Sequence, residues 1–145
     1  NRSNAVSQWY GYGNYYNWYA ATAGNGTYSI TSGNATGDIC PNGWSLPTGG
    51  NSGEFSVLDV AIGGDGSAQY AAEASNRWRT YPRNFVFSGG WQGASSNYRS
   101  YNGHYWSRTA SYYYDAHYLR FVSNSVSPIN STDKRYGRSI RCLAR

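Results

Sequence analysis

The chain has 145 residues, enough for one domain with a sizeable core. Only 13% of the residues are charged, but sixteen Tyr and six Trp can bury the apolar area that the scarce aliphatic residues do not supply, which argues against a disordered chain. The net charge of +5 rests on arginines and one lysine, Lys134, without the Lys-rich stripe of nucleic-acid-binding proteins, and no apolar run is long enough to span a membrane.

An aromatic stretch near the N-terminus, residues 8–21, is predicted to form a strand. Alternate residues from Tyr16 onward are apolar, so one face of this strand can join the core. Residues 22–37 are rich in Gly, Asn and Thr and favour a loop, in which Tyr28 and Ile30 are candidate anchors.

Two short helices are predicted next. Asn51 is a candidate N-cap and Glu54 lies three residues later, as in a capping box. The helix ends at the glycine-rich residues 63–66, and Ala-rich residues 67–75 favour a second helix. Three apolar residues spaced three or four apart form the expected core stripe of the first helix: Phe55, Leu58 and Ile62.

Short strands separated by Gly, Ser and Asn turns fill the rest of the chain. Leu119 and Phe121 alternate with Tyr118 and Arg120, which predicts one buried face and one wetter face. Helices followed by antiparallel strands indicate an α+β fold in which the helices are segregated from the sheet. The clearest strands are Asn84–Phe87, Tyr105–Arg108, Tyr118–Phe121 and Ser139–Leu143.

The two cysteines, Cys40 and Cys142, lie near opposite ends of the chain. Neither belongs to a metal-type CxxC motif, so we expect a disulfide between them, with two free thiols as the alternative. Closing a loop of about a hundred residues contributes roughly 4–5 kcal/mol in the chain-entropy model. Because disulfides persist in oxidising compartments, the pairing also predicts an extracellular protein.

The residue types that carry catalysis or bind metals are scattered. His104 and His117 belong to no HExxH motif or Cys/His cluster, and we expect both to be exposed polar residues. Glu54 is explained as a carboxylate at the start of a helix and Asp65 as a turn residue. No serine lies in a GxSxG motif. The sequence therefore predicts no enzyme, no metal site and no cofactor.

Arg77, Arg79 and Arg83 are interleaved with aromatic residues, an arrangement that also occurs in proteins that bind single-stranded nucleic acid. The alternative is that these arginines cap loops and stack on surface rings. We favour the alternative because lysines do not accompany them, so no nucleic-acid partner is expected.

Residues 88–125 combine Tyr and Trp with Ser, Asn and Gly, the mixture that antibody paratopes use. Tyrosine supplies contact area with few rotatable bonds, while the small polar residues supply adaptable hydrogen bonds. Such a surface suits a glycan or a protein epitope, whereas the structural alternative is that the rings cover a small sheet. The candidate ligand-binding residues are Trp91, Tyr98, Arg99, Tyr101, Tyr112, Tyr113, Tyr114 and Asp115.

Several motifs together resemble the Fibrobacter succinogenes major paralogous domain family, whose members are surface-associated bacterial domains with a C-type-lectin-like architecture. The resemblance covers most of the chain, and its most specific pieces are the Cys-Pro-x-Gly-Trp-x-Leu-Pro-Thr and Gly-x-Ser-Ile-Arg-Cys motifs. The matching segments are Tyr15–Ala21, Ile39–Thr48, Gly53–Phe55, His104–Ala110, Ala116–Phe121 and Tyr136–Cys142.

This resemblance implies a Cys40–Cys142 bond, an anchor at Trp44 and Leu46 before the first helix, and a core strand around Trp106. It also implies that the chain is a single C-type-lectin-like domain, residues 1–145, from the C-terminal part of a longer surface protein. The calcium and sugar signatures of true C-type lectins do not occur in the sequence. The resemblance therefore implies the lectin-like fold without calcium-dependent sugar binding, and a fold does not assign a function.

The expected function is a non-enzymatic recognition or adhesion module on the bacterial cell surface. Its partner would be a glycan or a surface protein. The alternatives are a subunit or exposed head of a pilus-like filament that self-assembles through its aromatic face, and a retroelement-diversified variable binding protein whose Tyr- and Asn-rich loops vary.

Overall fold

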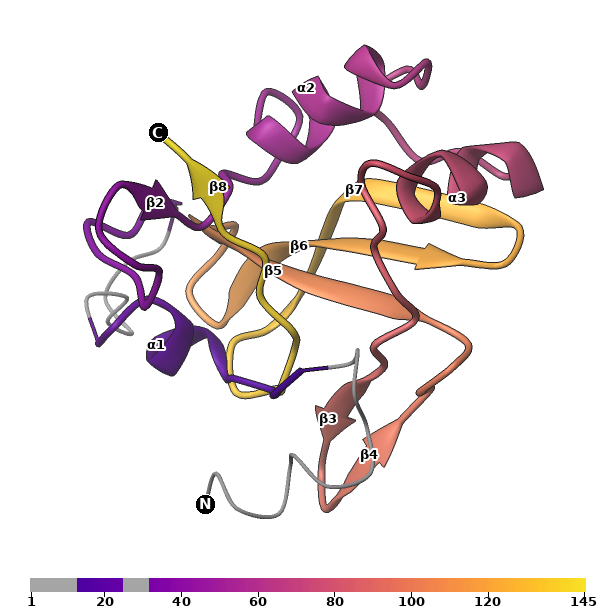
Figure 1. The fold of residues 1–145 in the computed structure, drawn as a ribbon. Coiled ribbons are helices and arrows are strands. Elements are labelled where there is room, and N and C mark those ends of the chain that lie inside the picture. The colour runs from indigo at the N-terminus through magenta and orange to yellow at the C-terminus, as the bar shows by residue number, and fades with distance from the viewer. Residues whose placement is uncertain (1–12, 25–31) are drawn as a thin grey trace.

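The computed structural model describes residues 13–24 and 32–145 and shows an α+β fold (Figure 1). Within these residues the chain forms three short helices and small antiparallel sheets. The helices are α1 (Trp18–Ala21), α2 (Glu54–Ala61) and α3 (Ala72–Arg79). The strands are β1 (Gly33–Asn34), β2 (Trp44–Ser45), β3 (Gly90–Gln92), β4 (Ser95–Asn97), β5 (Gly103–Ala110), β6 (Asp115–Val122), β7 (Ser125–Asp133) and β8 (Leu143–Ala144).

The central sheet has four antiparallel strands in the order β1-β5-β6-β7. β5 and β6 form a hairpin in which Tyr105 faces Leu119 and Trp106 faces Tyr118, and β6 and β7 form the next hairpin. Two smaller sheets stand apart from this one: β2 pairs with β8, and β3 pairs with β4. The β3–β4 hairpin lies below the sheet in Figure 1, and α2 and α3 lie above it.

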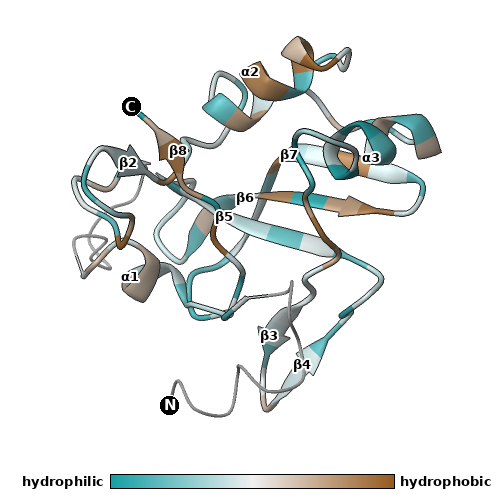
Figure 2. Cartoon of the chain, viewed as in Figure 1, coloured by the Kyte–Doolittle hydropathy of each residue, from teal (hydrophilic) through white to brown (hydrophobic). Residues whose placement is uncertain are grey.

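Both faces of the central sheet are buried, each in its own core. Tyr105 and Leu119 pack with Trp78 beneath α2 and α3, while Trp106 and Tyr118 pack on the opposite face. Figure 2 shows apolar stretches on β6 and on α2. The prediction that Tyr118 lies on a wetter face is therefore wrong, because its side chain is only 6% exposed. Aromatic residues replace aliphatic ones in both cores, as the composition predicts.

The predicted N-terminal strand is wrong where the structure describes it, because Trp18–Ala21 forms α1. The Asn17 side chain accepts a hydrogen bond from the backbone N–H of Ala20 at 2.8 Å, which caps this helix. Trp18 and Ala21, three residues apart, are both fully buried on one face of the helix. Residues 8–12 and the candidate anchors Tyr28 and Ile30 lie outside the described residues.

The start of α2 confirms the role predicted for Glu54 but not the one predicted for Asn51. Gly53 is the N-cap residue. Thr48 and Glu54 instead form a reciprocal pair: the Glu54 carboxylate accepts from the Thr48 N–H at 2.8 Å, and the Thr48 hydroxyl accepts from the Glu54 N–H at 2.9 Å. Thr48, the reciprocal partner of Glu54, is thus six residues before it, whereas a capping box places the partner three residues before the glutamate.

The second helix is real but begins later than predicted. Asp65 accepts hydrogen bonds from the Ser67 N–H and hydroxyl, which confirms it as a turn residue. Gln69 pairs with Val126 of β7 and so cannot be helical. Helix α3 extends instead to Arg79 and includes Trp78, whose buried indole N–H donates to the Asp59 carboxylate at 3.0 Å.

Two of the four predicted strands lie within β5 and β6. Residues 84–87 form no strand, and Val86 instead exchanges hydrogen bonds of 3.1 and 3.0 Å with the Tyr105 hydroxyl. Residues 139–143 are only partly paired, since Ser139 makes an isolated bridge to Tyr105 and β8 begins at Leu143.

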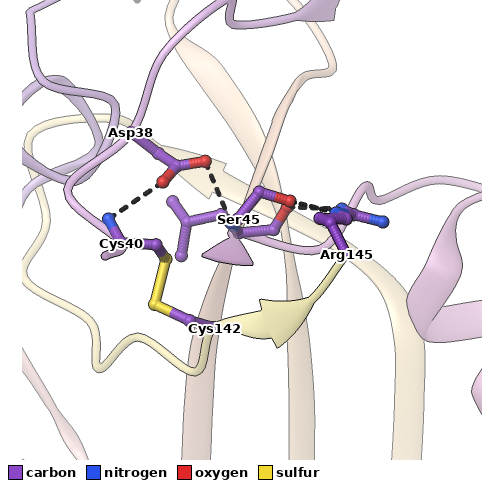
Figure 3. The surroundings of a disulfide bond; sticks show 6 residues. Asp38, Cys40, Ser45, Cys142 and Arg145 are labelled. Carbon is purple, nitrogen blue, oxygen red and sulfur yellow. Dashed lines mark hydrogen bonds between the residues drawn. A yellow bond between two sulfur atoms is a disulfide. The ribbon is translucent and has the colours of Figure 1, made fainter. Parts of the chain in front are cut away.

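Cys40 and Cys142 form the predicted disulfide, with a Cα–Cα distance of 5.8 Å (Figure 3). Next to it, the Asp38 carboxylate accepts from the backbone N–H groups of Cys40 and Leu46, at 2.9 and 3.0 Å. Arg145 donates to Ser45 across the β2–β8 pair and forms an ion pair with Glu54. The C-terminus is therefore fastened to the loop before α2 by a covalent bond, a two-stranded sheet and an ion pair.

The anchor predicted before α2 is confirmed for Leu46, which is fully buried. Trp44 differs: it is 50% exposed on the two-stranded β2–β8 sheet. Trp106 is fully buried in β5, as predicted for a core strand.

Candidate functional site

The structure places the predicted binding residues in two groups at opposite ends of β5. Trp91 on β3 and the loop after β4 (residues 98–102) precede β5, while the β5–β6 turn (residues 111–114) follows it. Eight extended residues separate the two ends by roughly 26 Å. The first group contains Trp91, Tyr98, Arg99 and Tyr101, and the second contains Tyr112, Tyr113, Tyr114 and Asp115.

Trp91 borders a surface pocket of about 490 Å³, within the size range of small-molecule sites. Its walls come from β3, from the segment before α1 and from the segment after β7. The lining residues are Asn14, Tyr15, Tyr16, Asn17, Trp91, Arg135 and Gly137. Three aromatic residues and two asparagines therefore line the same space. We call it the Trp91 pocket.

A glycine brings the two aromatic walls of the Trp91 pocket together. A Cβ atom on Gly137 would lie 2.7 Å from the Cβ of Trp91, closer than real Cβ contacts, and 3.1 Å from the Cβ of Tyr15, tighter than most of them. Backbone hydrogen bonds between Gly137 and Trp91, at 2.7 and 2.8 Å, hold β3 against this segment. Only glycine allows this approach, so the aromatic walls of the pocket depend on it.

Arg99 supports the Tyr15 wall. Its guanidinium lies 5.6 Å from the centre of the Tyr15 ring, and its Nε donates to the Tyr15 hydroxyl at 3.2 Å. The Tyr15 hydroxyl in turn donates to the backbone carbonyl of Ser88. The ring is therefore held from several sides before any ligand arrives.

The loop after β4 has a strained backbone. Tyr98 and Ser100 both have left-handed φ angles, +60° and +69°. The carbonyl of Tyr98 accepts from the N–H groups of Tyr101 and Asn102, at 3.1 and 2.9 Å. These bonds hold an arrangement that side-chain-bearing residues rarely adopt, and such strain is typical of functional loops. Tyr98 and Tyr101 are exposed but do not line the Trp91 pocket.

The β5–β6 turn presents three exposed tyrosines, Tyr112–Tyr114. Buried Lys134 holds this turn: its backbone N–H donates to the Tyr114 carbonyl at 2.8 Å and its Nζ donates to the Tyr113 carbonyl at 3.0 Å. The rings of Tyr113 and Tyr114 meet edge to face, with centroids 4.9 Å apart. We call this feature the tyrosine turn.

His104 and Arg138 form a buried polar pair behind β3, each only 4% exposed. The absence of a side chain at Gly90 makes room for both, because a Cβ there would lie 2.1 Å from Arg138 Nη1. Desolvation, followed by the charge of Arg138, lowers the pKa of His104 to about 3. The prediction that His104 is exposed is therefore wrong. His117 is half-buried, with Nδ1 3.3 Å from the Ile129 carbonyl oxygen.

The Arg-rich segment around α3 makes internal contacts. Arg77 donates to the side chain of Gln69 at 2.6 Å, and Arg83 donates to the backbone carbonyl of Arg77. Arg79 stacks over the Phe87 ring, 3.9 Å from its centre. These are the loop-capping and ring-stacking roles that the sequence favoured.

Sequence reasoning found Trp91 and Arg99 but missed the opposite wall of the pocket. Tyr15 was only part of the predicted N-terminal strand, and the close approach at Gly137 joins segments that are far apart in sequence. Within the described residues, no three His, Cys, Asp or Glu side chains lie together as candidate metal ligands. None of the helices in residues 13–24 and 32–145 is both long enough and apolar enough to cross a lipid bilayer.

Compared with family models, with curated proteins and with solved structures, the chain matches none of them.

Proposed function

We propose that the protein is a non-enzymatic extracellular recognition module that binds a carbohydrate chain in the Trp91 pocket. The observation that carries this proposal is the pair of aromatic walls, Trp91 and Tyr15, held together across Gly137. Indole and phenol rings offer flat apolar faces with a polar edge, and the C–H face of a sugar ring can pack on them.

The polar groups of the Trp91 pocket fit the same ligand. Asn14 adds an amide that can both donate and accept hydrogen bonds, as sugar hydroxyls require, and Asn17, whose Oδ1 caps α1, adds an NH2 donor. Trp91 is 45% exposed, so its ring is available to a ligand. The support from Arg99 and Ser88 behind Tyr15 lowers the entropy lost on binding.

A C-type-lectin-like architecture and a bacterial cell-surface location belong to the same proposal. The Cys40–Cys142 bond supports an oxidising compartment. Leu46 and Trp106 occupy the buried positions that the family resemblance implies. The α+β arrangement with a disulfide-fastened C-terminus is compatible with that architecture.

A screen of the disulfide-intact protein against immobilised glycans tests the proposal. Any glycan that binds is then titrated against Trp91→Ala and against Trp44→Ala, a matched control because Trp44 is 50% exposed on another two-stranded sheet. We expect Trp91→Ala to weaken binding roughly tenfold or more and Trp44→Ala to leave it unchanged. Binding that survives Trp91→Ala, or no binding to any glycan, contradicts the proposal.

A second candidate function is a protein contact through the tyrosine turn, either to a surface protein or to another copy in a filament. The observation that favours it is that two hydrogen bonds from Lys134 hold the turn that exposes Tyr112–Tyr114. Tyrosines of this kind are enriched at protein interfaces. Sedimentation at increasing concentration tests the filament form: association that Tyr112→Ser and Tyr114→Ser abolish supports it, and a concentration-independent monomer contradicts it.

A further inference from the structure

We propose that the ligand of the Trp91 pocket is an anionic polysaccharide, a chain of sugar rings that carry carboxylate or sulfate groups. The inference rests on the proposed function and adds the chemical class of the ligand. It comes from a second pocket beside the first and from three arginines spaced three residues apart: Arg135, Arg138 and Arg141.

The second pocket has a volume of about 280 Å³ and shares Asn14 and Tyr16 with the Trp91 pocket. Tyr16 pairs with Arg138 through two backbone hydrogen bonds, both 2.9 Å. Because Tyr16 lines both pockets, the two pockets lie next to this one backbone pairing. Two adjacent pockets suit a ligand with several repeating units better than a single small molecule. We call the second one the Arg141 pocket.

The arginines follow this pair of pockets along the chain. Arg135 lines the Trp91 pocket and Arg141 lines the Arg141 pocket. Arg135 is held by an ion pair with Asp133. Arg141 stacks over Phe85, 4.6 Å from the ring centre, and among the described residues no carboxylate lies within ion-pair distance of it.

Arg138 lies between the two and adds a buried positive charge. Its guanidinium packs beside the rings of Tyr118 and Tyr136, at 5.3 and 5.5 Å, and its Nε has no hydrogen-bond partner among the described residues. A guanidinium stays charged in proteins, and a buried charge is weakly screened. This buried cation therefore contributes a positive charge behind both pockets.

Asp133 offsets the charge of Arg135, but among the described residues no carboxylate forms an ion pair with Arg138 or Arg141. Of the described residues that line either pocket, none is Asp or Glu. Elsewhere, Asp38, Asp59 and Glu54 are engaged in internal hydrogen bonds. The site thus combines stacking rings, amides and the guanidinium groups of Arg138 and Arg141, which no described carboxylate pairs with, and this suits sugars with fixed negative charges.

Nucleic acid shares the negative charge and the need for stacking, but the observations favour the polysaccharide. Proteins that bind nucleic acid contact many phosphates through exposed Lys and Arg. In this chain the single lysine is buried, and Arg77, Arg79 and Arg83 make internal contacts instead of forming a stripe along the pockets.

The test compares matched ligands on the disulfide-intact protein. Polygalacturonate is compared with its neutral methyl ester, and dextran sulfate with dextran, so that carboxylate and sulfate are distinguished. Oligodeoxythymidylate represents nucleic acid. At low ionic strength we expect at least one anionic polymer to bind roughly tenfold more tightly than its neutral counterpart and to lose affinity as salt is added.

Arg141→Gln should weaken binding of that polymer roughly five- to tenfold. Arg79→Gln is the matched control, because Arg79 also stacks on a phenylalanine but lines neither pocket, and it should have less than roughly a twofold effect. Should Arg141→Gln fail to fold, the salt dependence of the unmodified protein still decides between charged and neutral ligands.

Each remaining outcome has a separate meaning. Equal binding of the charged and neutral polymers, still sensitive to Trp91→Ala, overturns the anionic class and leaves the proposed function standing. Tighter binding of oligodeoxythymidylate than of any polysaccharide overturns the inference in favour of nucleic acid. If the protein binds none of these polymers and none of the glycans in the screen, both proposals are overturned.

Discussion

Lys134, the only lysine of the chain, donates a hydrogen bond from its Nζ to the Tyr113 carbonyl oxygen at 3.0 Å. The side chain is fully buried, with Nζ 4.7 Å from the centre of the Trp18 ring. A residue type that usually extends into solvent therefore ties a surface turn to one of the two cores. The tyrosine turn owes its fixed shape to this contact.

Lys134→Met tests that relationship, because methionine keeps most of the stem while removing the ammonium. We expect the free energy of unfolding to fall by about 1–3 kcal/mol, the contribution of a hydrogen bond to a charged group. Urea denaturation measures the loss, and hydrogen exchange shows whether the turn becomes mobile. A variant as stable and as protected as the parent contradicts this role of the ammonium.

The disulfide should account for a large part of the stability. Replacing both Cys40 and Cys142 with Ala removes a cross-link between residues 102 positions apart. The chain-entropy model predicts a loss of about 4–5 kcal/mol, enough to unfold many domains. Denaturation with and without a reducing agent measures it. If reduction leaves the unfolding midpoint unchanged, the C-terminus is held by its non-covalent contacts alone.

Buried His104 should make the protein sensitive to mild acid. Its pKa is about 3 in the folded chain and 6.5 when unperturbed. Between these values the unfolded chain binds a proton that the folded chain does not, so stability falls as the pH drops below about 6.5. The slope is about 1.4 kcal/mol per pH unit, or about 2 kcal/mol between pH 6.5 and 5.

Comparison with His104→Gln isolates this effect, since the variant lacks the titrating imidazole. Glu54 and Asp133, whose pKa values are lowered chiefly by hydrogen bonds to Arg145 and Arg135, lose their stabilising effect at more acidic pH. The variant should therefore show a flatter stability profile between pH 7 and 5. Identical profiles for the two proteins would show that His104 does not titrate abnormally.

The left-handed backbone at Tyr98 predicts an unusual response to glycine. Tyr98→Gly should stabilise the fold by up to about 1 kcal/mol, because glycine adopts φ of +60° without strain. Tyr101 has a similar exposed ring but no left-handed φ, so Tyr101→Gly should destabilise by about 0.5–1 kcal/mol. Thermal denaturation of both variants checks the contrast, and equal losses contradict it.

The sequence predicted those parts of the fold that depend on local pattern or composition. The α+β class, the β5–β6 strands and the Cys40–Cys142 bond were accessible from residue types and spacing, and the buried Trp106 from the family resemblance. The start and end of α3 were not accessible in this way. They depend on the contact between Trp78 and Asp59, which are brought together only by tertiary packing. Short helices follow such contacts more than their own propensities.

For a related reason, only some residues of the candidate site could be predicted from the sequence. Trp91 and Arg99 stand out by residue type in a Tyr- and Asn-rich segment. Tyr15 does not, because its alternating neighbours resemble a core strand. The role of Gly137 in bringing Tyr15 to Trp91 is a matter of distance between backbones, which no one-dimensional pattern records.

The central claim is tested most directly by NMR of the tryptophan indole N–H groups. Their resonances are followed while a polysaccharide that the protein binds is titrated in. Trp18, Trp78 and Trp106 are fully buried, so they report on the fold, while Trp91 and Trp44 are exposed. We predict that the Trp91 signal shifts with saturation and that the Trp44 signal does not. A shift at Trp44 with Trp91 unmoved would place the ligand elsewhere and contradict the Trp91 pocket as the site.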